Sequence, residues 1–143
     1  MNTIQKFGMA VLFSAVFAFG HGDVTPQKLD TSKLADIGED WLEENPYKDD
    51  NKIAVELGKQ GYGENCARCH GLEVISGGIA PDLRELLPID DDSYFQGKVL
   101  GGVVRNGNVY MPSFADYLDQ KGIWAIKTYI NTQRTKGIEK GDL

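Results

Sequence analysis

The sequence predicts an all-α protein, and three observations support this prediction. Apolar residues recur at three- and four-residue spacings within 52–65, 93–104 and 119–134, as they do along one face of a helix. No segment alternates convincingly in the two-residue period of a strand. The stretches between these regions contain glycine and proline, which favour loops. We therefore expect helices joined by irregular segments.

Residues 1–20 have the features of a cleavable signal peptide. A polar start with a single cation, Lys6, precedes an apolar run over 7–19, and the segment closes on the small residue Gly20. The run is shorter than the roughly 20 residues that span a bilayer, which argues against an uncleaved membrane anchor. We expect cleavage after Gly20. The mature chain would then begin at His21, lie in the periplasm and have no membrane span.

The segment 21–51 is expected to be an extended N-terminal arm. It is polar and has too little apolar content for a packed domain of its own. A short helix is expected within it over 34–43, because apolar residues recur there at helical spacing. The rest of the arm would lie on the surface of the domain that follows.

The predicted domain covers 52–134, and its first helix is expected over 52–65. Every fourth residue falls on one face of that helix: Ala54, Gly58, Tyr62 and Cys66. Gly58 and Gly61 each lower helix stability by about 1 kcal/mol relative to alanine. A cost of that size indicates that another stretch of backbone approaches closely at this point.

Two further helices are expected downstream. The first, over 93–104, begins at a serine that can cap it, and the second, over 119–134, begins at an aspartate that can do the same. The segments 71–88 and 105–114 contain glycine and proline and are expected to be loops, the first with at most one helical turn. The polar tail 135–143 is expected to fray.

Composition and charge exclude several classes of function. The chain of 143 residues has 21 acidic and 15 basic residues and a formal net charge of −6, which argues against nucleic-acid binding. Two cysteines cannot form a multi-disulfide scaffold. The acidic run 90–92 is expected to be a solvated loop before a helix, in preference to a partner-docking site or a calcium site.

Both cysteines and one of the two histidines fall within five consecutive positions. The stretch 66–70, Cys-Ala-Arg-Cys-His, is the C-x-x-C-H pattern of covalent haem attachment. Two thiols at the end of a helix can each add to one haem vinyl group, and His70 is then placed beneath the iron. We therefore predict one haem c, attached through Cys66 and Cys69, with His70 as the proximal iron ligand.

Two other interpretations of this motif fit the sequence less well. A redox-active disulfide between Cys66 and Cys69 would resemble thioredoxin-like proteins, but their motif follows a strand, whereas a predicted helix precedes this one. A closed structural zinc site needs a fourth ligand and usually a second Cys/His pair. The mature chain offers only the distant His21.

Met111 is the candidate for the second axial ligand of the iron. It is the one methionine left after removal of the signal peptide, and Pro112 disfavours a helical conformation at the sulfur-bearing residue. A methionine sulfur is soft and neutral, favours ferrous iron and raises the reduction potential. His21 is an alternative ligand. A third possibility is an open coordination site, which would indicate a haem enzyme or a gas sensor.

The residues around the motif resemble a class I cytochrome c. Gly58 and Tyr62 stand eight and four residues before the first cysteine, where that family has a helix-crossing glycine and an aromatic residue. The segment 78–83 resembles the family's proline loop. By this resemblance the Pro81 carbonyl would accept the Nδ1–H hydrogen bond of His70, and the C-terminal helix would cross the first helix at Gly58. The fold would be helices around one covalently bound haem.

Four stretches, 21–27, 45–47, 65–72 and 76–84, are similar to the small periplasmic cytochromes c that accept electrons from quinoprotein (PQQ-dependent) alcohol dehydrogenases. This resemblance implies such a dehydrogenase as electron donor, and a terminal oxidase or another cytochrome as acceptor. We expect a monomeric one-electron carrier of the respiratory chain that takes part in alcohol oxidation and is not itself an enzyme. A general donor to an oxidase, with no dehydrogenase partner, is an alternative.

Overall fold

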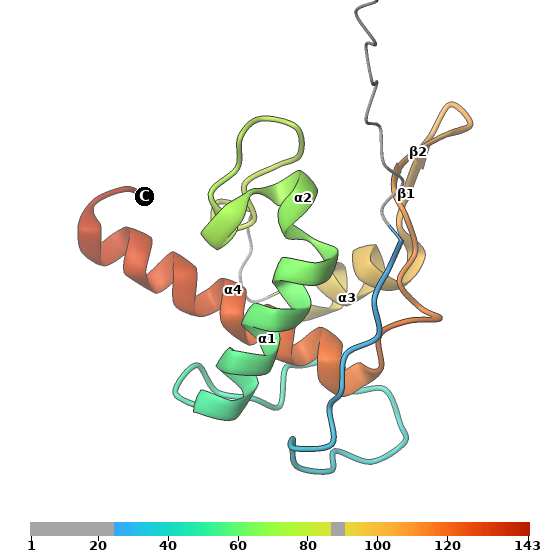
Figure 1. Ribbon diagram of the computed structural model, residues 1–143, viewed down its shortest axis with the longest axis vertical. Coiled ribbons are helices and arrows are strands. Elements are labelled where there is room, and N and C mark those ends of the chain that lie inside the picture. Colours follow the sequence, from blue (N-terminus) through green and yellow to red (C-terminus); the bar gives the residue numbers. More distant parts are fainter. Residues whose placement is uncertain (1–24, 87–90) are drawn as a thin grey trace, which may run out of the picture.

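Four α-helices and one short hairpin make up the described part of this computed structural model, residues 25–86 and 91–143 (Figure 1). In chain order the elements are α1 Lys52–Asn65, α2 Ala67–His70, the 3₁₀ turn Leu72–Val74, α3 Asp92–Gly101, β1 Val103–Arg105, β2 Asn108–Met111 and α4 Gln120–Lys140. The predicted signal peptide, His21 and Asp90 lie outside the described residues. Among those that are described, no helix is both long enough and apolar enough to span a membrane.

The hairpin of β1 and β2 is the main departure from the all-α prediction. It is antiparallel. Strand β2 lies in the segment expected to be a loop, 105–114, whereas β1 begins within the helix expected over 93–104, which ends earlier, at Gly101. Its turn is Asn106-Gly107, with φ of +51° and +78°, and an Asn-Gly pair is a strong local signal for a two-residue hairpin turn. The signal is therefore present in the sequence, although the strands are too short for their alternation to be recognised. The remaining elements are helical, as predicted.

Helices α1 and α4 cross in contact at Gly58 (Figure 1). A Cβ atom at Gly58 would lie 1.9 Å from the carbonyl oxygen of Ala125, so only glycine fits between the two backbones. The predicted crossing is confirmed. The prediction of a backbone approach is wrong for Gly61, where the close neighbours are the side chains of Leu29 and Ile126.

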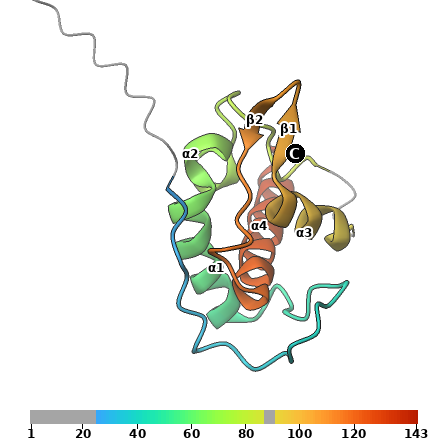
Figure 2. The same ribbon diagram turned by 90° about the vertical axis from the view of Figure 1, so that its right-hand side faces the viewer.

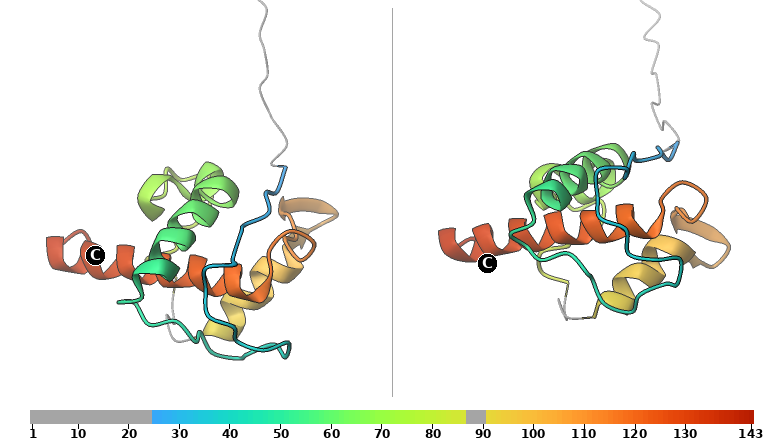
Figure 3. Two further views of the ribbon diagram at one scale, coloured as in Figure 1. Left: turned by 60° about the horizontal axis from the view of Figure 1, so that its bottom comes forward. Right: turned by 90° about the horizontal axis from the view of Figure 1, so that it is seen from below.

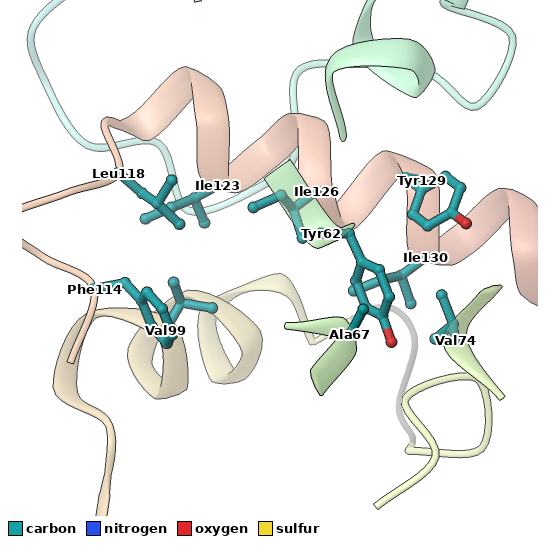
Figure 4. Packing of buried hydrophobic residues seen from close by; sticks show 10 residues of the cluster. All are labelled: Tyr62, Ala67, Val74, Val99, Phe114, Leu118, Ile123, Ile126, Tyr129 and Ile130. Atoms are coloured by element: carbon teal, nitrogen blue, oxygen red, sulfur yellow. The ribbon is translucent and has the colours of Figure 1, made fainter. Parts of the chain in front are cut away.

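Ten buried apolar side chains form the main core, between α4 and the elements that face it (Figure 4). They come from every part of the domain: Tyr62, Ala67, Val74, Val99, Phe114, Leu118, Ile123, Ile126, Tyr129 and Ile130. Because α4 contributes the largest share, this helix is the support against which the functional motif is built.

The N-terminal arm packs on the domain without a helix of its own. Residues 34–43, all of them described, form turns and bends, so the short helix expected there is wrong. The physical reason is a turn in which the Asp36 carboxylate accepts the N–H of Gly38, whose φ of +84° no helix contains. Leu34 and Tyr47 are instead buried in a second cluster with Trp124 of α4.

Two side-chain amides fasten the arm to the domain, where it runs beside α1 and beneath α4 (Figures 2 and 3). Gln120 accepts the N–H of Leu42 through Oε1 and donates through Nε2 to the carbonyl of Asp40. Asn65 accepts the N–H of Gln27 and donates to the carbonyl of the same residue. Each amide thus bonds to one N–H and one carbonyl of the arm's backbone, as a neighbouring strand would.

The N-terminus of α3 differs from the prediction in two respects. Asp91, not Ser93, caps the helix by accepting the N–H of Tyr94. Asp92, expected to lie in a solvated acidic loop, is instead turned inward and forms an ion pair of 3.6 Å with the buried Lys127 of α4. A tertiary contact explains the difference, because Lys127, the cation that pairs with Asp92, is distant in the sequence.

Helix α4 begins as predicted and ends later than predicted. Asp119 caps it by accepting the N–H of Gly122. The helix continues past 134 to Lys140 and stops at Gly141, which adopts a left-handed φ of +75°. Most of the tail expected to fray is therefore helical. Its apolar stripe ends near 130, but Arg134 donates to the carbonyl of Arg84 and extends the contact with the domain.

Candidate functional site

The C-x-x-C-H motif forms the turn that follows α1. Cys66 caps the C-terminus of α1, donating its N–H to the carbonyl of Tyr62 at 2.8 Å. The carbonyl of Cys66 then accepts from the N–H groups of Cys69 and His70, which makes α2. Residues three apart in a helical turn share a face, so the two half-buried thiols are neighbours, as two vinyl attachments on one ring require.

His70 is oriented by the loop that follows it. Its Nδ1 lies 2.9 Å from the carbonyl oxygen of Pro81, the pair that the family resemblance implied. Because a carbonyl oxygen only accepts, Nδ1 carries a proton, and in the neutral imidazole this leaves Nε2 as the nitrogen that can bind a metal. Gly71, with φ of +84°, lets the chain reverse here, and its carbonyl accepts the hydroxyl of Tyr62 at 2.8 Å.

A buried ion pair closes the loop that holds Pro81. The Asp82 carboxylate accepts from the N–H of Ser76 and the N–H of Arg84, and also from the Nε and Nη2 atoms of the Arg84 guanidinium, the last at 2.8 Å. These bonds span both sides of Pro81 and so fix its carbonyl against His70. The hydrogen bond from Arg84 lowers the pKa of Asp82 below its ordinary value of 3.8.

We expect the Asp82→Asn variant to be less stable than wild type at pH 7 by about 1.5 kcal/mol or more, the usual worth of hydrogen bonds to a charged group. Because the folded pKa is lowered, the stabilisation is present above pH 3.8 and is lost as the pH falls through the folded value. The difference between wild type and variant should therefore shrink at pH 3. Urea unfolding at both pH values measures it, with the exposed Asp116→Asn as control. A difference independent of pH would contradict this account.

Met111 is the last residue of β2 and is half-buried. Its side chain packs against the main core, and the half-buried Cys66, Leu83 and Phe95 pack against the same cluster. The structure therefore joins His70 directly to Pro81, and places Met111 and Cys66 at the edge of one apolar cluster. Neither the Asp82–Arg84 pair nor Gly102, which contacts the backbone of Met111, is apparent from the motifs of the sequence.

The surroundings of the thiols argue against the two other interpretations of the motif. Burial and, to a smaller extent, the neighbouring Cys69 raise the pKa of the Cys66 thiol to about 12. Redox-active cysteines need a lowered pKa, because the thiolate is the nucleophile. Within the described residues, no group of three or more histidine, cysteine, aspartate or glutamate side chains could hold a metal ion such as zinc. His21 lies outside those residues.

The donor set fits a covalently attached haem. Two thiols on one face of a helical turn, an imidazole with Nε2 unprotonated, and a thioether at the edge of the same apolar cluster are the groups that such a haem requires. The apolar cluster would keep water from one side of the ring.

Comparisons with known proteins agree with this chemistry. The family model described as cytochrome C oxidase, cbb3-type, subunit III matches residues 54–130. Cytochrome c550 of Pseudomonas aeruginosa is 48% identical over 128 residues, which cover 87% of this chain and 88% of the relative.

Two quinohemoprotein alcohol dehydrogenases of Pseudomonas putida are also similar. ADH-IIG is 34% identical over 68% of this chain, and ADH IIB is 42% identical over 53% of it. The matches span only 13% and 11% of those enzymes. A solved structure of ADHIIG from Pseudomonas putida HK5 superposes with a TM-score of 0.58 and 32% identity, covering 78% of this chain and 16% of that one.

Proposed function

Because the chain belongs to the cytochrome c family, we propose that it carries single electrons from a quinoprotein alcohol dehydrogenase to an acceptor of the respiratory chain. It is an electron-transfer protein with covalently bound haem c, not an enzyme. The observation that supports the donor is the similarity to segments of two quinohemoprotein alcohol dehydrogenases. A separate carrier would serve a dehydrogenase that has no such segment in its own chain. The acceptor would be a terminal oxidase or another cytochrome.

In this proposal Cys66 and Cys69 hold the haem by two thioethers, and His70 and Met111 bind the iron. When bound, the haem supplies the one-electron change between ferrous and ferric iron. The chain sets how readily that change occurs. Pro81 accepts the Nδ1–H of His70, which fixes the ring and makes Nε2 a stronger donor, and the neutral sulfur of Met111 favours the ferrous state.

We further propose that the protein is exported and works as a monomer in the periplasm. The pattern over 1–20 is that of a signal peptide, and covalent attachment suits a carrier in a compartment without a haem supply. The domain of 52–134 would carry the haem, with the arm of 21–51 fastened over its helices. The net charge of −6 for the full chain becomes −7 once Lys6 leaves with the signal peptide, which would favour a donor with a basic docking face.

The donor assignment is tested by mixing the oxidised protein with a quinoprotein alcohol dehydrogenase of the same organism and a primary alcohol. We expect rapid reduction of the haem, which its absorption spectrum reports. Reduction should become slower as salt is added. Omission of the alcohol, or of the quinone cofactor from the enzyme, should abolish it. If the complete mixture does not reduce the haem, the dehydrogenase is not the donor. A general oxidase donor then remains.

The ligand assignment is tested by Met111→Ala. We expect the variant to keep its covalently attached haem, because the thioethers do not depend on the axial ligand, and to have a markedly lower reduction potential. Redox titration measures the potential, and carbon monoxide should bind the reduced variant faster than wild type. An unchanged potential would exclude Met111 as a ligand. Rapid carbon monoxide binding to wild type would favour the open-site alternative.

A further inference from the structure

We propose that Gly102 is a positioning residue for the sulfur of Met111, a role that rests on the proposed ligation by Met111. Gly102 follows α3 directly and donates its N–H to the carbonyl of Lys98. Its φ is +67° and its ψ is −164°, a conformation that residues with a side chain rarely adopt. The chain turns here from α3 into β1, the strand that pairs with β2.

The backbone of the Met111 segment lies directly on Gly102. A Cβ atom at position 102 would stand 2.5 Å from the carbonyl oxygen of Met111, 2.9 Å from the carbonyl carbon of Pro112 and 3.0 Å from the nitrogen of Ser113. All three are backbone atoms, which cannot rotate away as a flexible side chain would. Any residue other than glycine must therefore displace the segment that carries the sulfur.

The same segment is anchored to the end of α3 by two hydrogen bonds. The hydroxyl of Ser113 donates to the carbonyl of Leu100, and the N–H of Phe114 donates to the carbonyl of Val99 at 3.0 Å. Phe114 is buried in the main core close to Val99 (Figure 4).

These anchors fix the chain just after Met111, and β1 pairs with Met111 through Val103. Between the two attachments, the backbone of Met111 lies directly against Gly102. The backbone that carries the sulfur is thus held by α3, independently of any bond between the sulfur and a metal. A ligand placed in advance in this way resists replacement by a competitor.

The test is Gly102→Ala, with free imidazole as the competing ligand. In the oxidised haem protein imidazole must displace the sulfur to bind, so its affinity reports how well the sulfur is placed. We expect the variant to bind imidazole about tenfold more tightly or more, since strain of this kind is worth a factor of that order. We also expect a lower reduction potential with the haem still attached. Unchanged imidazole affinity would overturn the proposal.

Two other glycines provide matched controls. Gly101 ends α3, and a Cβ there would meet no described atom within 4 Å. Gly107, at the hairpin tip, has φ of +78° and likewise no described atom within 4 Å. Gly101→Ala tests an added methyl group alone, and Gly107→Ala tests backbone strain in the hairpin alone. We expect near wild-type imidazole affinity in both. If Gly107→Ala acts as strongly as Gly102→Ala, general strain and not contact with Met111 is responsible.

The Met111→Ala variant separates failure of this inference from failure of the ligand assignment. If Met111→Ala and wild type bind imidazole equally, the sulfur is not a ligand and both proposals fall. If Met111→Ala binds more tightly but Gly102→Ala does not, only the positioning role falls. Should Gly102→Ala not accumulate as a haem protein, Ser113→Ala removes one anchor without adding atoms. We expect this variant also to bind imidazole more tightly than wild type. An unchanged imidazole affinity would overturn the proposal.

Discussion

Replacing Gly58 by alanine is expected to lower the free energy of unfolding by about 3 kcal/mol or more, the upper end of what overpacking costs. The added Cβ would lie 1.9 Å from the carbonyl oxygen of Ala125 and 3.0 Å from the Cβ of Tyr129. The first contact is with the backbone of a buried helix, so the two helices must separate. Their separation would expose the core on both sides of the crossing.

The effect should extend to the haem motif, because α1 carries it. Tyr62 lies one turn after Gly58, its ring 5.5 Å from that of Tyr129, and its hydroxyl bonds to the carbonyl of Gly71 beside His70. We therefore expect Gly58→Ala to show a broadened haem spectrum as well as a lower midpoint in urea unfolding.

Gly63 provides the control for this prediction. It lies in the same helix, is exposed, and a Cβ there would meet no described atom within 4 Å. Gly63→Ala should therefore raise stability, by up to about 1 kcal/mol, because alanine is the better helix former. A Gly58→Ala protein as stable as Gly63→Ala would mean that α1 and α4 do not cross at Gly58.

The parts of the fold that could be predicted are those set by neighbours in the sequence. Helix α1 has the expected bounds, because its apolar spacing lies within the segment itself and its N-cap, Asn51, directly precedes it. The motif at 66–70 is likewise local. The pairing of His70 with Pro81 came from the family resemblance, and the structure places the two within hydrogen-bond distance.

The parts that could not be predicted depend on partners far away in the sequence. The arm contains helical apolar spacing at 34–43, yet besides the turn at Gly38, Gln120, distant in the sequence, binds the N–H of Leu42 and the carbonyl of Asp40. Gly102 resembles an ordinary helix-ending glycine until Met111 is found against it. In both cases the local pattern is real, but a tertiary contact decides the conformation.

Asp92 is another residue whose position is set by a partner far away in the sequence. Its carboxylate lies 3.6 Å from the Lys127 ammonium through one oxygen and accepts the N–H of Asn45 through the other, at 2.7 Å. The side chains are only 16% and 7% exposed, and the ammonium also lies 5.4 Å from the centre of the Phe95 ring. One pair thus connects the arm, α3 and α4.

We expect Lys127→Met to destabilise the protein by about 3 to 5 kcal/mol, because it leaves a buried carboxylate without the cation beside it. The loss would come from the charge left behind and not from the missing bond. The double variant Asp92→Leu with Lys127→Met should therefore recover much of the stability, since apolar residues can replace a buried pair at little cost.

Urea unfolding of the two single variants, the double variant and wild type gives the coupling between the two side chains. Lys136→Met, on the exposed side of the same helix, should change stability by no more than about 0.5 kcal/mol. If Lys127→Met behaves like Lys136→Met, the ion pair is exposed to water in solution. If the double variant is no more stable than Lys127→Met alone, the cost lies in packing around Phe95. Only recovery in the double variant identifies the stranded charge as the cause, and so explains why an acidic residue in a polar run is held inside the fold.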